Sequence, residues 1–332
     1  MSSPWQWLYG TAHRLRRRWW ASRRLHLPRP VVSIGNLHWG GSGKTPLTAA
    51  TAAHLVEAGY RVAILSRGYG RRDQQVRVVS IGEGPLLGPS LAGDEPVLLA
   101  GEVPGAAVVV GPERYAAGRV AMQRLDPPPD VFILDDAFSH LALARDVDLL
   151  VLPASDPLGG GRLWPSGRLR EPLAASVHAD AILLSGGTQG DAEAVGKELE
   201  SVGFAGRAFG CERRFDAPRR ITGEEVAEGS RVLLVSGIAR PEEFESAVGR
   251  LDLDVLGALV FPDHHDYPPD TLREITAAFE ESTADFLLTT AKDRVKLLGR
   301  LDLPLAELPL RAIPEEMFWR WLDARMAELA PR

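Results

Sequence analysis

Hydrophobic residues along this chain occur in short continuous runs, separated by longer stretches with helical spacing. Short apolar runs rich in β-branched residues are typical of buried strands, and apolar positions that recur every three or four residues are typical of amphipathic helices. The pattern predicts strands at 31–34, 61–65, 107–110, 131–134, 147–152, 181–185, 231–235, 254–261, 285–289 and 308–313, and helices at 47–58, 97–100, 113–124, 191–202, 241–248, 269–281, 292–298 and 314–329. Because repeated strand–helix units form parallel sheets, we predict an α/β fold with a mostly parallel sheet and helices on both faces.

Changes in composition at two places divide this alternation of strands and helices into three parts. Residues 207–220, with Cys211 and several arginines, are interpreted as a connector to a second, smaller α/β series. The N-terminal segment differs from all that follows. We therefore predict an N-terminal amphipathic helix over residues 1–27, a larger α/β domain over 28–205 and a smaller one over 206–332.

The first 30 residues hold four of the eight tryptophans, seven arginines and no acid. On a helix, one face would carry Trp5, Leu8, Tyr9, Ala12, Leu15 and Trp19, with Arg14, Arg17 and Arg18 largely opposite. A basic aromatic helix of this kind suits an anionic membrane surface. The alternative is a helix whose tryptophans pack on the protein's own core.

The bulk composition argues against several classes of protein. The net charge of −6 argues against a general nucleic-acid binder, and a single cysteine excludes an internal disulfide. No apolar run reaches the roughly 18 residues that a membrane-spanning helix needs. No protein partner is predicted.

A glycine-rich loop follows the strand at 31–34 and leads into Lys44, Thr45 and a helix. Backbone N–H groups of such a loop point at phosphates, the lysine reaches the β- and γ-phosphates, and the threonine hydroxyl can bind Mg²⁺. The predicted nucleotide-binding residues are His38, Trp39, Gly40, Gly41, Ser42, Gly43, Lys44 and Thr45. The general motif has glycine where this chain has His38, so the alternative is an ordinary turn with chance glycines.

Acidic residues follow other predicted strands and loops. Asp135 and Asp136 end the apolar run at 131–134, where a phosphate-loop protein places the acids that hold Mg²⁺ directly or through water. Asp94 precedes a helical run and is interpreted from its position as a helix cap. Residues 263–266 (Asp-His-His-Asp) allow a metal site, a histidine–carboxylate pair for proton transfer, or a structural role.

Two basic loops are candidate substrate contacts. Arg67 and Tyr69 lie in a glycine-rich turn after the strand at 61–65, and Arg170 and Glu171 lie in the long loop over 155–172. Arginines at the carboxyl end of a parallel sheet suit a phosphorylated ligand. A solvated basic turn is the alternative for the first loop.

These motifs occur in a specific order: Gly40–Pro46, Ser66–Gly70, Gly93–Pro96, Leu169–Pro172 and Phe261–His265. Together with the basic aromatic N-terminus, this order resembles the tetraacyldisaccharide 4′-kinase family over nearly the whole chain. The resemblance implies a two-domain P-loop kinase that uses ATP and Mg²⁺ to phosphorylate the 4′-hydroxyl of a tetraacyldisaccharide 1-phosphate lipid in lipid A biosynthesis. It implies peripheral attachment at the cytoplasmic face of the inner membrane.

The resemblance also changes the interpretation of individual residues. It implies that Asp94 is the catalytic carboxylate, that His264 supports it, and that Asp135 and Asp136 belong to the Mg²⁺–ATP site. The chain departs from the family pattern at Ala137 and Ser139, where the family has glycine and glutamine, and at Ala291, where it has glutamate.

Two other functions compete with the kinase. One is a P-loop ATPase or GTPase switch, which the sequence disfavours because Trp39 replaces the lysine of dimeric ATPases and no guanine-reading motif is present. The other is a membrane-surface protein that binds nucleotide but lacks lipid kinase activity.

Overall fold

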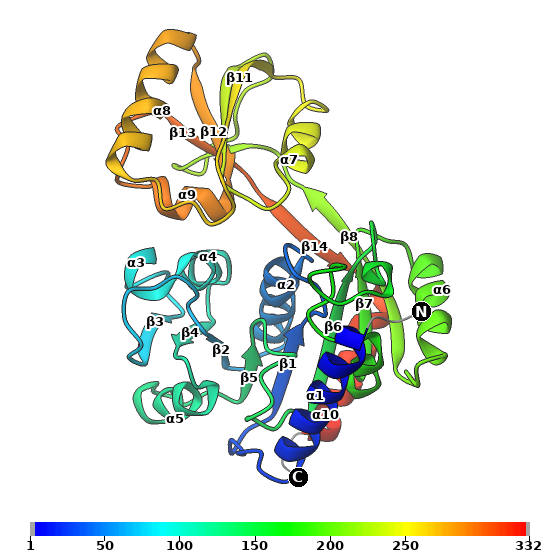
Figure 1. The fold of residues 1–332 in the computed structure, drawn as a ribbon. Coiled ribbons are helices and arrows are strands. Elements are labelled where there is room, and N and C mark those ends of the chain that lie inside the picture. The colour runs from blue at the N-terminus through cyan, green and yellow to red at the C-terminus, as the bar shows by residue number, and fades with distance from the viewer. Residues whose placement is uncertain (1–3, 330–332) are drawn as a thin grey trace.

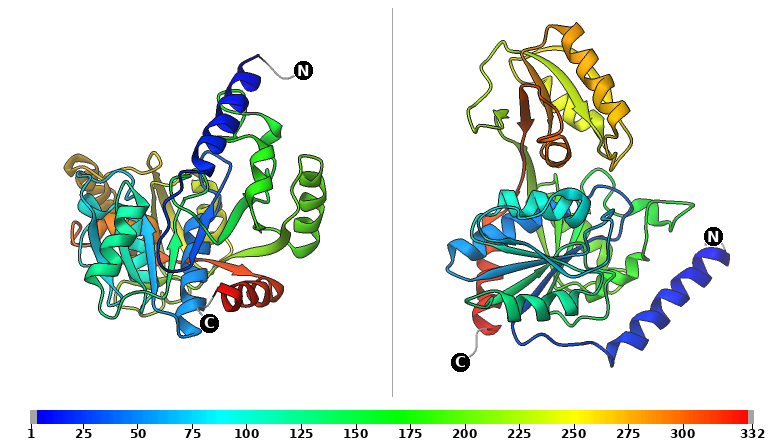
Figure 2. Two further views of the ribbon diagram at one scale, coloured as in Figure 1. Left: turned by 90° about the horizontal axis from the view of Figure 1, so that it is seen from below. Right: turned by 90° about the vertical axis from the view of Figure 1, so that its left-hand side faces the viewer.

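A computed structural model describes residues 4–329 of the protein; for residues 4–9 it describes only the course of the backbone. It contains two α/β units, connected through two paired strands, with the N-terminal helix α1 (Pro4–Ala21) along the side of the first (Figures 1 and 2). The predicted fold class is confirmed.

The first unit is built on a nine-stranded sheet. In spatial order its strands are β14 (Leu310–Pro314), β8 (Arg207–Phe215), β7 (Ala181–Ser185), β6 (Val147–Pro153), β1 (Val31–Gly35), β5 (Val131–Leu134), β2 (Val62–Ser66), β4 (Ala107–Val110) and β3 (Arg77–Ile81). The two outer strands, β14 and β3, are antiparallel to their neighbours, and all other pairs are parallel.

Helices cover both faces of this sheet because successive strand side chains point to opposite sides. Val32 and Ile34 pack on one side with α2 (Lys44–Glu57), α4 (Asp94–Glu102) and α10 (Glu316–Leu329). The opposite face packs against α5 (Arg114–Arg124) and α6 (Gln189–Glu200). The remaining short pieces are α3 (Pro89–Ala92), η1 (Gly159–Gly161) and η2 (Leu173–His178).

The second unit repeats this plan at smaller scale. Its sheet has the order β11 (Asp254–Val260), β10 (Arg231–Ser236), β12 (Phe286–Thr290), β13 (Leu305–Leu308) and β9 (Arg219–Arg220), with only β9 antiparallel. Helix α7 (Pro241–Val248) packs on one face, and α8 (Pro269–Ser282) and α9 (Ala291–Leu297) lie on the other.

The structure corrects the predicted division of the chain. The expected connector at 207–220 begins with β8, and β8, β14 and α10 fall within residues 206–332 but belong to the first unit. The strand predicted at 308–313 is two strands in two sheets, because the chain passes from one unit to the other at Pro309. Strand β3 was not predicted, because only two of its five residues are buried.

Helix α1 presents the opposite face to the one expected for packing on the core. Leu15 and Trp19 are 59% and 52% exposed, whereas Arg17 is only 8% exposed. Arg17 lies against the first unit, where its guanidinium stacks on Phe138. Of the predicted apolar face, the side chains of Trp5, Leu8 and Tyr9 lie outside the described residues. Within residues 4–329, no helix is long and apolar enough to cross a bilayer.

Candidate active site

The glycine-rich loop connects β1 to α2, which begins at Lys44. At Gly35 a Cβ would lie 2.4 Å from the Phe138 backbone nitrogen, so only glycine allows the chain to leave the strand here. Gly43 has a φ of 85°, and inside the loop the Asn36 amide donates a 2.7 Å hydrogen bond to Ser42. The loop therefore places the N-terminus of α2, with its free N–H groups, at the edge of the sheet.

His38 does not behave like the glycine it replaces. Its ring is buried, and Nε2 lies 3.0 Å from the Asp156 carbonyl oxygen. Burial is the main cause that lowers the pKa of His38, so the ring is neutral at pH 7. The imidazole thus fastens the long 155–172 loop to the phosphate loop, while Trp39 beside it is exposed.

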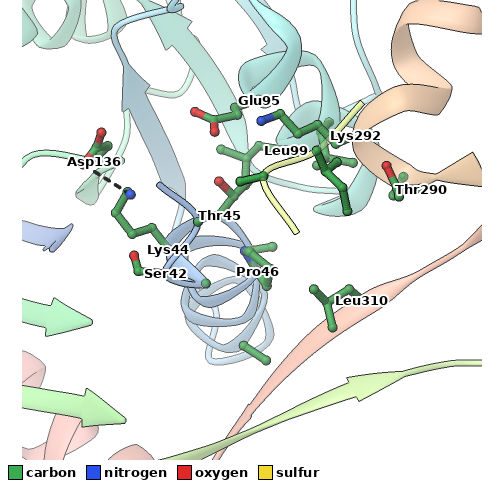
Figure 3. Close-up of a pocket in the computed structure, with 18 of the residues that line it drawn as sticks. Ser42, Lys44, Thr45, Pro46, Glu95, Leu99, Asp136, Thr290, Lys292 and Leu310 are labelled. Carbon is green, nitrogen blue, oxygen red and sulfur yellow. Dashed lines mark ion pairs between the residues drawn. The ribbon is translucent and has the colours of Figure 1, made fainter. Parts of the chain in front are cut away.

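A cavity of about 1080 Å³ opens between the two units, with the phosphate loop on one wall. The predicted residues His38 to Thr45, Arg67, Tyr69, Asp136, Arg170 and His264 all line it. Figure 3 shows Lys44 and Thr45 at the start of α2, with Lys44 pointing toward Asp136, and Glu95 of the first unit beside Lys292 of the second. Asp94, Asp135 and Glu171 are not among the lining residues. All three are buried, and Glu171 is bound by Arg17 and Ser139.

The pKa values of the two aspartates after β5 are shifted in opposite directions. Asp135 is buried and accepts hydrogen bonds from Thr48 and Ser66, both at 3.2 Å. Burial and the charge of Asp136 raise the pKa of Asp135. For Asp136 burial acts in the same direction, but Lys44 at 3.7 Å and Arg170 at 2.6 Å outweigh it and lower its pKa.

Glu95 is a site residue that the sequence analysis missed. It is partly buried and lines the cavity beside Asp94 (Figure 3). Loss of water and the charge of Asp135 raise its pKa to about 7. An acid in the first turn of a helix usually complements the helix dipole, which hid its role. The available signal was the pair of consecutive acids, the same pattern that marked Asp135 and Asp136.

Asp94 is not the N-cap of its helix, as its sequence position suggested, but a buried carboxylate with charged partners. Gly93 is the N-cap residue, and no side chain caps this helix end. Asp94 is 5% exposed, and its Oδ2 lies 3.1 Å from His264 Nδ1 and 3.1 Å from Lys296 Nζ. Burial alone raises the pKa of Asp94, but the hydrogen bond from His264 and the charges of Lys292 and Lys296 outweigh it and hold the pKa below its usual value.

His264 joins Asp94 to a second lysine. Lys292 Nζ lies 3.1 Å from His264 Nε2, and an ammonium group can only donate. Nε2 of the neutral ring is then the acceptor, which leaves the ring proton on Nδ1, where it is donated to Asp94. The carboxylate is in the first unit, and His264, Lys292 and Lys296 are in the second, so this chain of hydrogen bonds crosses the cavity.

The other residues of the Asp-His-His-Asp stretch have structural contacts. His265 stacks on Phe261, and its Nε2 lies 3.1 Å from the Thr271 hydroxyl. Asp263 is 3.3 Å from Lys292. In the described part of the chain no group of three or more His, Cys, Asp or Glu side chains is placed to hold a metal by itself. Of the three interpretations of residues 263–266, the structure favours the proton-transfer pair.

Comparison with known proteins identifies the family of this chain. A family model described as tetraacyldisaccharide-1-P 4′-kinase matches residues 1–327. The chain belongs to the tetraacyldisaccharide 4′-kinase family. The kinase of Geobacter sulfurreducens is 43% identical over 330 residues, which cover 97% of this chain and 90% of that protein. The kinase of Anaeromyxobacter sp. (strain Fw109-5) is 44% identical over 283 residues, covering 81% and 73%.

A solved structure extends the match to three dimensions. LpxK from Aquifex aeolicus, crystallised in complex with ATP, has a TM-score of 0.77 and 31% sequence identity, covering 99% of this chain and 98% of that one. Tetraacyldisaccharide 4′-kinases are ATP-dependent kinases, which confirms the predicted family and enzyme class.

Proposed function

We propose that this protein transfers the γ-phosphate of ATP to the 4′-hydroxyl of a tetraacyldisaccharide 1-phosphate lipid in lipid A biosynthesis. Family membership supports the reaction. The observation that carries its assignment to named residues is the Asp94–His264–Lys292 chain, which faces the phosphate loop across one cavity. A switch protein needs bound nucleotide, but it has no need of a buried proton acceptor opposite the phosphates.

The loop from His38 to Thr45 is the proposed binding site for the phosphates of ATP. Lys44 is the cation within reach of the β- and γ-phosphates, and it is held toward the cavity by Asp136 at 3.7 Å. The N–H groups at the start of α2 supply further positive potential.

The residues present also fit Mg²⁺, which binds hard oxygen donors. Burial raises the pKa of both Asp135 and Glu95, and a neighbouring acid adds to each rise: Asp136 acts on Asp135, and Asp135 acts on Glu95. We assign Thr45, Asp135 and Asp136 to the metal, with Glu95 as an added ligand. When bound, Mg²⁺ neutralises charge on the phosphates of ATP.

Asp94 is the proposed general base. Its lowered pKa keeps it ionised at neutral pH, so it can accept the proton of the acceptor hydroxyl as that oxygen bonds to phosphorus. A strong base is unnecessary, because phosphoryl transfer passes through a loose transition state in which the attacking oxygen bonds late. His264 Nδ1–H fixes the carboxylate in position, and Arg67, Tyr69 and Arg170 are the proposed contacts of the lipid head group.

Helix α1 is the proposed membrane-docking element. It exposes Leu15 and Trp19, and arginines surround them in the sequence. Exposed tryptophan and leucine beside arginines suit the interface of an anionic bilayer. We therefore place the enzyme at the cytoplasmic face of the inner membrane as a peripheral protein.

The test is to incubate the purified protein with γ-labelled ATP, Mg²⁺ and the disaccharide 1-phosphate lipid, and to follow the label. Label in the lipid supports the kinase, whereas label only in free phosphate identifies an ATPase. Lys44→Ala should abolish transfer without loss of folding, because the lost contact is with phosphate. Wild-type rates from a folded Lys44→Ala protein would contradict the proposal.

A further inference from the structure

We infer that Glu102 is a positioning residue for phosphate transfer. Glu102 belongs to a cluster of ion pairs, here called the latch, that connects the two units. By connecting them it fixes the geometry of the Asp94–His264 hydrogen bond. The inference rests on the proposed function, because it assigns a task within the same active site. The latch is defined by four side chains: Glu102, Arg219, Arg294 and Glu307.

The latch and the catalytic pair occupy the two ends of one helix. Asp94 is the first residue of α4 and Glu102 is the last. At the Asp94 end the second unit supplies His264 and Lys296, each at 3.1 Å. At the Glu102 end it supplies two guanidinium groups: Arg219 Nη2 lies 3.2 Å from Glu102 Oε1, and Arg294 Nη2 lies 3.8 Å from it.

The two arginines are held in place within the second unit itself. Glu307 on β13 is 3% exposed, and its oxygens lie 2.8 Å from Arg219 Nε and 2.6 Å from Arg294 Nε. Arg219 is on β9 and Arg294 is on α9, so one buried carboxylate orients both cations toward the first unit. Glu102 is the first unit's contribution to the latch.

Two contacts at separate ends of a helix fix an orientation that one contact leaves open. The ends of a nine-residue helix are about 12 Å apart. The units are also connected through β8 and β14, through the Arg213–Glu243 pair at 2.6 Å, and through Val295 of α9, which packs in the core of the first unit. None of these contacts lies at the Glu102 end on a charged group of α4, so the latch is the polar contact that fixes this end of the helix. If the Glu102 end opened, the second unit could pivot on the Asp94 contact, and His264 would lose its hydrogen-bond geometry.

The experiment compares Glu102→Gln with wild type, and each of these with the same protein carrying His264→Ala. We expect Glu102→Gln to lower kcat about tenfold with little change in KM for ATP. In the His264→Ala background it should lower kcat less than twofold, because the positioned group is already gone. Asp216→Asn is the matched control: it removes a carboxylate from the connection between the units, where Asp216 pairs with Arg311, and should leave kcat unchanged.

A second measurement does not depend on phosphate transfer. The ¹⁵N chemical shifts of the His264 ring report which nitrogen holds the proton. We expect mainly Nδ1–H in the wild type and in Asp216→Asn, and a smaller Nδ1–H fraction in Glu102→Gln. This shift would support the latch even if the wild type failed to phosphorylate lipid. The latch is wrong if Glu102→Gln leaves both kcat and the ring shifts unchanged, or if it costs the same factor with and without His264.

Discussion

At the scale of single residues, the pKa values of four carboxylates in and beside one cavity are shifted in opposite directions. Cationic neighbours lower the pKa of Asp94 and Asp136, whereas burial and neighbouring acids raise the pKa of Asp135 and Glu95. The first pair is therefore ionised and ready to accept protons or to pair with cations. The second pair is destabilised by its own negative charge until a cation binds.

Glu95 makes the stability of the ligand-free protein depend on pH. A pKa of about 7 in the folded protein, against 4.5 in the unfolded chain, means that the folded state binds the proton more tightly. The contribution of Glu95 to the free energy of unfolding is then fully present below pH 4.5 and is lost as the pH rises to 7. By linkage we expect the free energy of unfolding of Glu95→Gln to exceed that of the wild type by about 3 kcal/mol at pH 8 and to match it near pH 4.5.

Urea unfolding without Mg²⁺ or nucleotide at the two pH values measures this difference. Glu198→Gln, on the exposed side of α6, is the control and should show no change with pH. An advantage of Glu95→Gln that is the same at both pH values would show that the carboxyl does not titrate as stated.

The acid–base pair makes a kinetic prediction. Asp94→Asn should lower kcat by about 10²–10⁴-fold with little change in ATP affinity, and His264→Ala should cost less. Because His264 acts through Asp94, the double variant should lose less than the product of the two factors. The measurement is steady-state kinetics of the wild type, the two single variants and the double variant. Losses in kcat that multiply fully would mean that the two residues act independently.

Residue roles were predictable from sequence only where a motif fixes the local backbone. Lys44 and Thr45 follow from the strand–loop–helix pattern alone. Asp94 looks like an ordinary cap, because its partners His264 and Lys296 lie about 170 and 200 residues away in the chain. Glu171 was expected at the substrate, but its buried partner Arg17 lies in a segment that gave no sign of contacting that loop.

At the scale of elements, α1 shows how one ion pair can fix a helix. The buried Arg17–Glu171 pair at 2.7 Å keeps the Arg17 side of the helix on the protein and leaves Leu15 and Trp19 outside. Hydrophobic spacing predicted the helix but could not choose the packed face, because the choice depends on a carboxylate elsewhere in the chain. In strand β8 the local sequence did not predict even the element, because it is rich in charged residues. Its pairing with β7 and β14 makes this segment a strand.

Point variants of α1 separate docking from stability. Leu15→Ala with Trp19→Ala should reduce co-sedimentation with anionic vesicles at low salt and leave the melting temperature unchanged, since both side chains are exposed. Arg17→Ala should instead destabilise the protein by about 3 kcal/mol, because it leaves the buried Glu171 unpaired. Ile81→Ala, which removes an exposed apolar residue on β3, is the control. Full vesicle binding by the Leu15/Trp19 variant would refute the docking role of this face.

At the scale of the whole molecule, the second unit is an insertion between two paired strands. Phe215 at the end of β8 lies opposite Leu310 at the start of β14. Local patterns predicted the strands and helices of both units. They did not predict that the chain returns to the first sheet at β14, because the order of strands in a sheet depends on contacts between distant segments. The predicted boundary near residue 206 failed for that reason.

Excision tests this arrangement. Replacing residues 216–309 with a short glycine–serine linker leaves all nine strands and the packed helices of the first sheet. We expect a cooperatively folded protein by circular dichroism and thermal melting, with no phosphate transfer, because His264, Lys292 and Lys296 are removed. His264→Ala in the intact chain is the comparison and should retain more activity. Failure of the shortened chain to fold would show that the first unit depends on the second.

The Arg17–Glu171 pair has a consequence for geometry at the bilayer. In the docked state proposed above, this pair would stop α1 from rotating about its own axis, so that the enzyme would have one tilt and Asp94 would stand at one height above the hydrocarbon boundary. The acceptor sugar must rise to that height while its acyl chains stay in the lipid. Acceptors should therefore be ranked by how far their 4′-hydroxyl projects from the membrane as well as by the chemistry of the sugar.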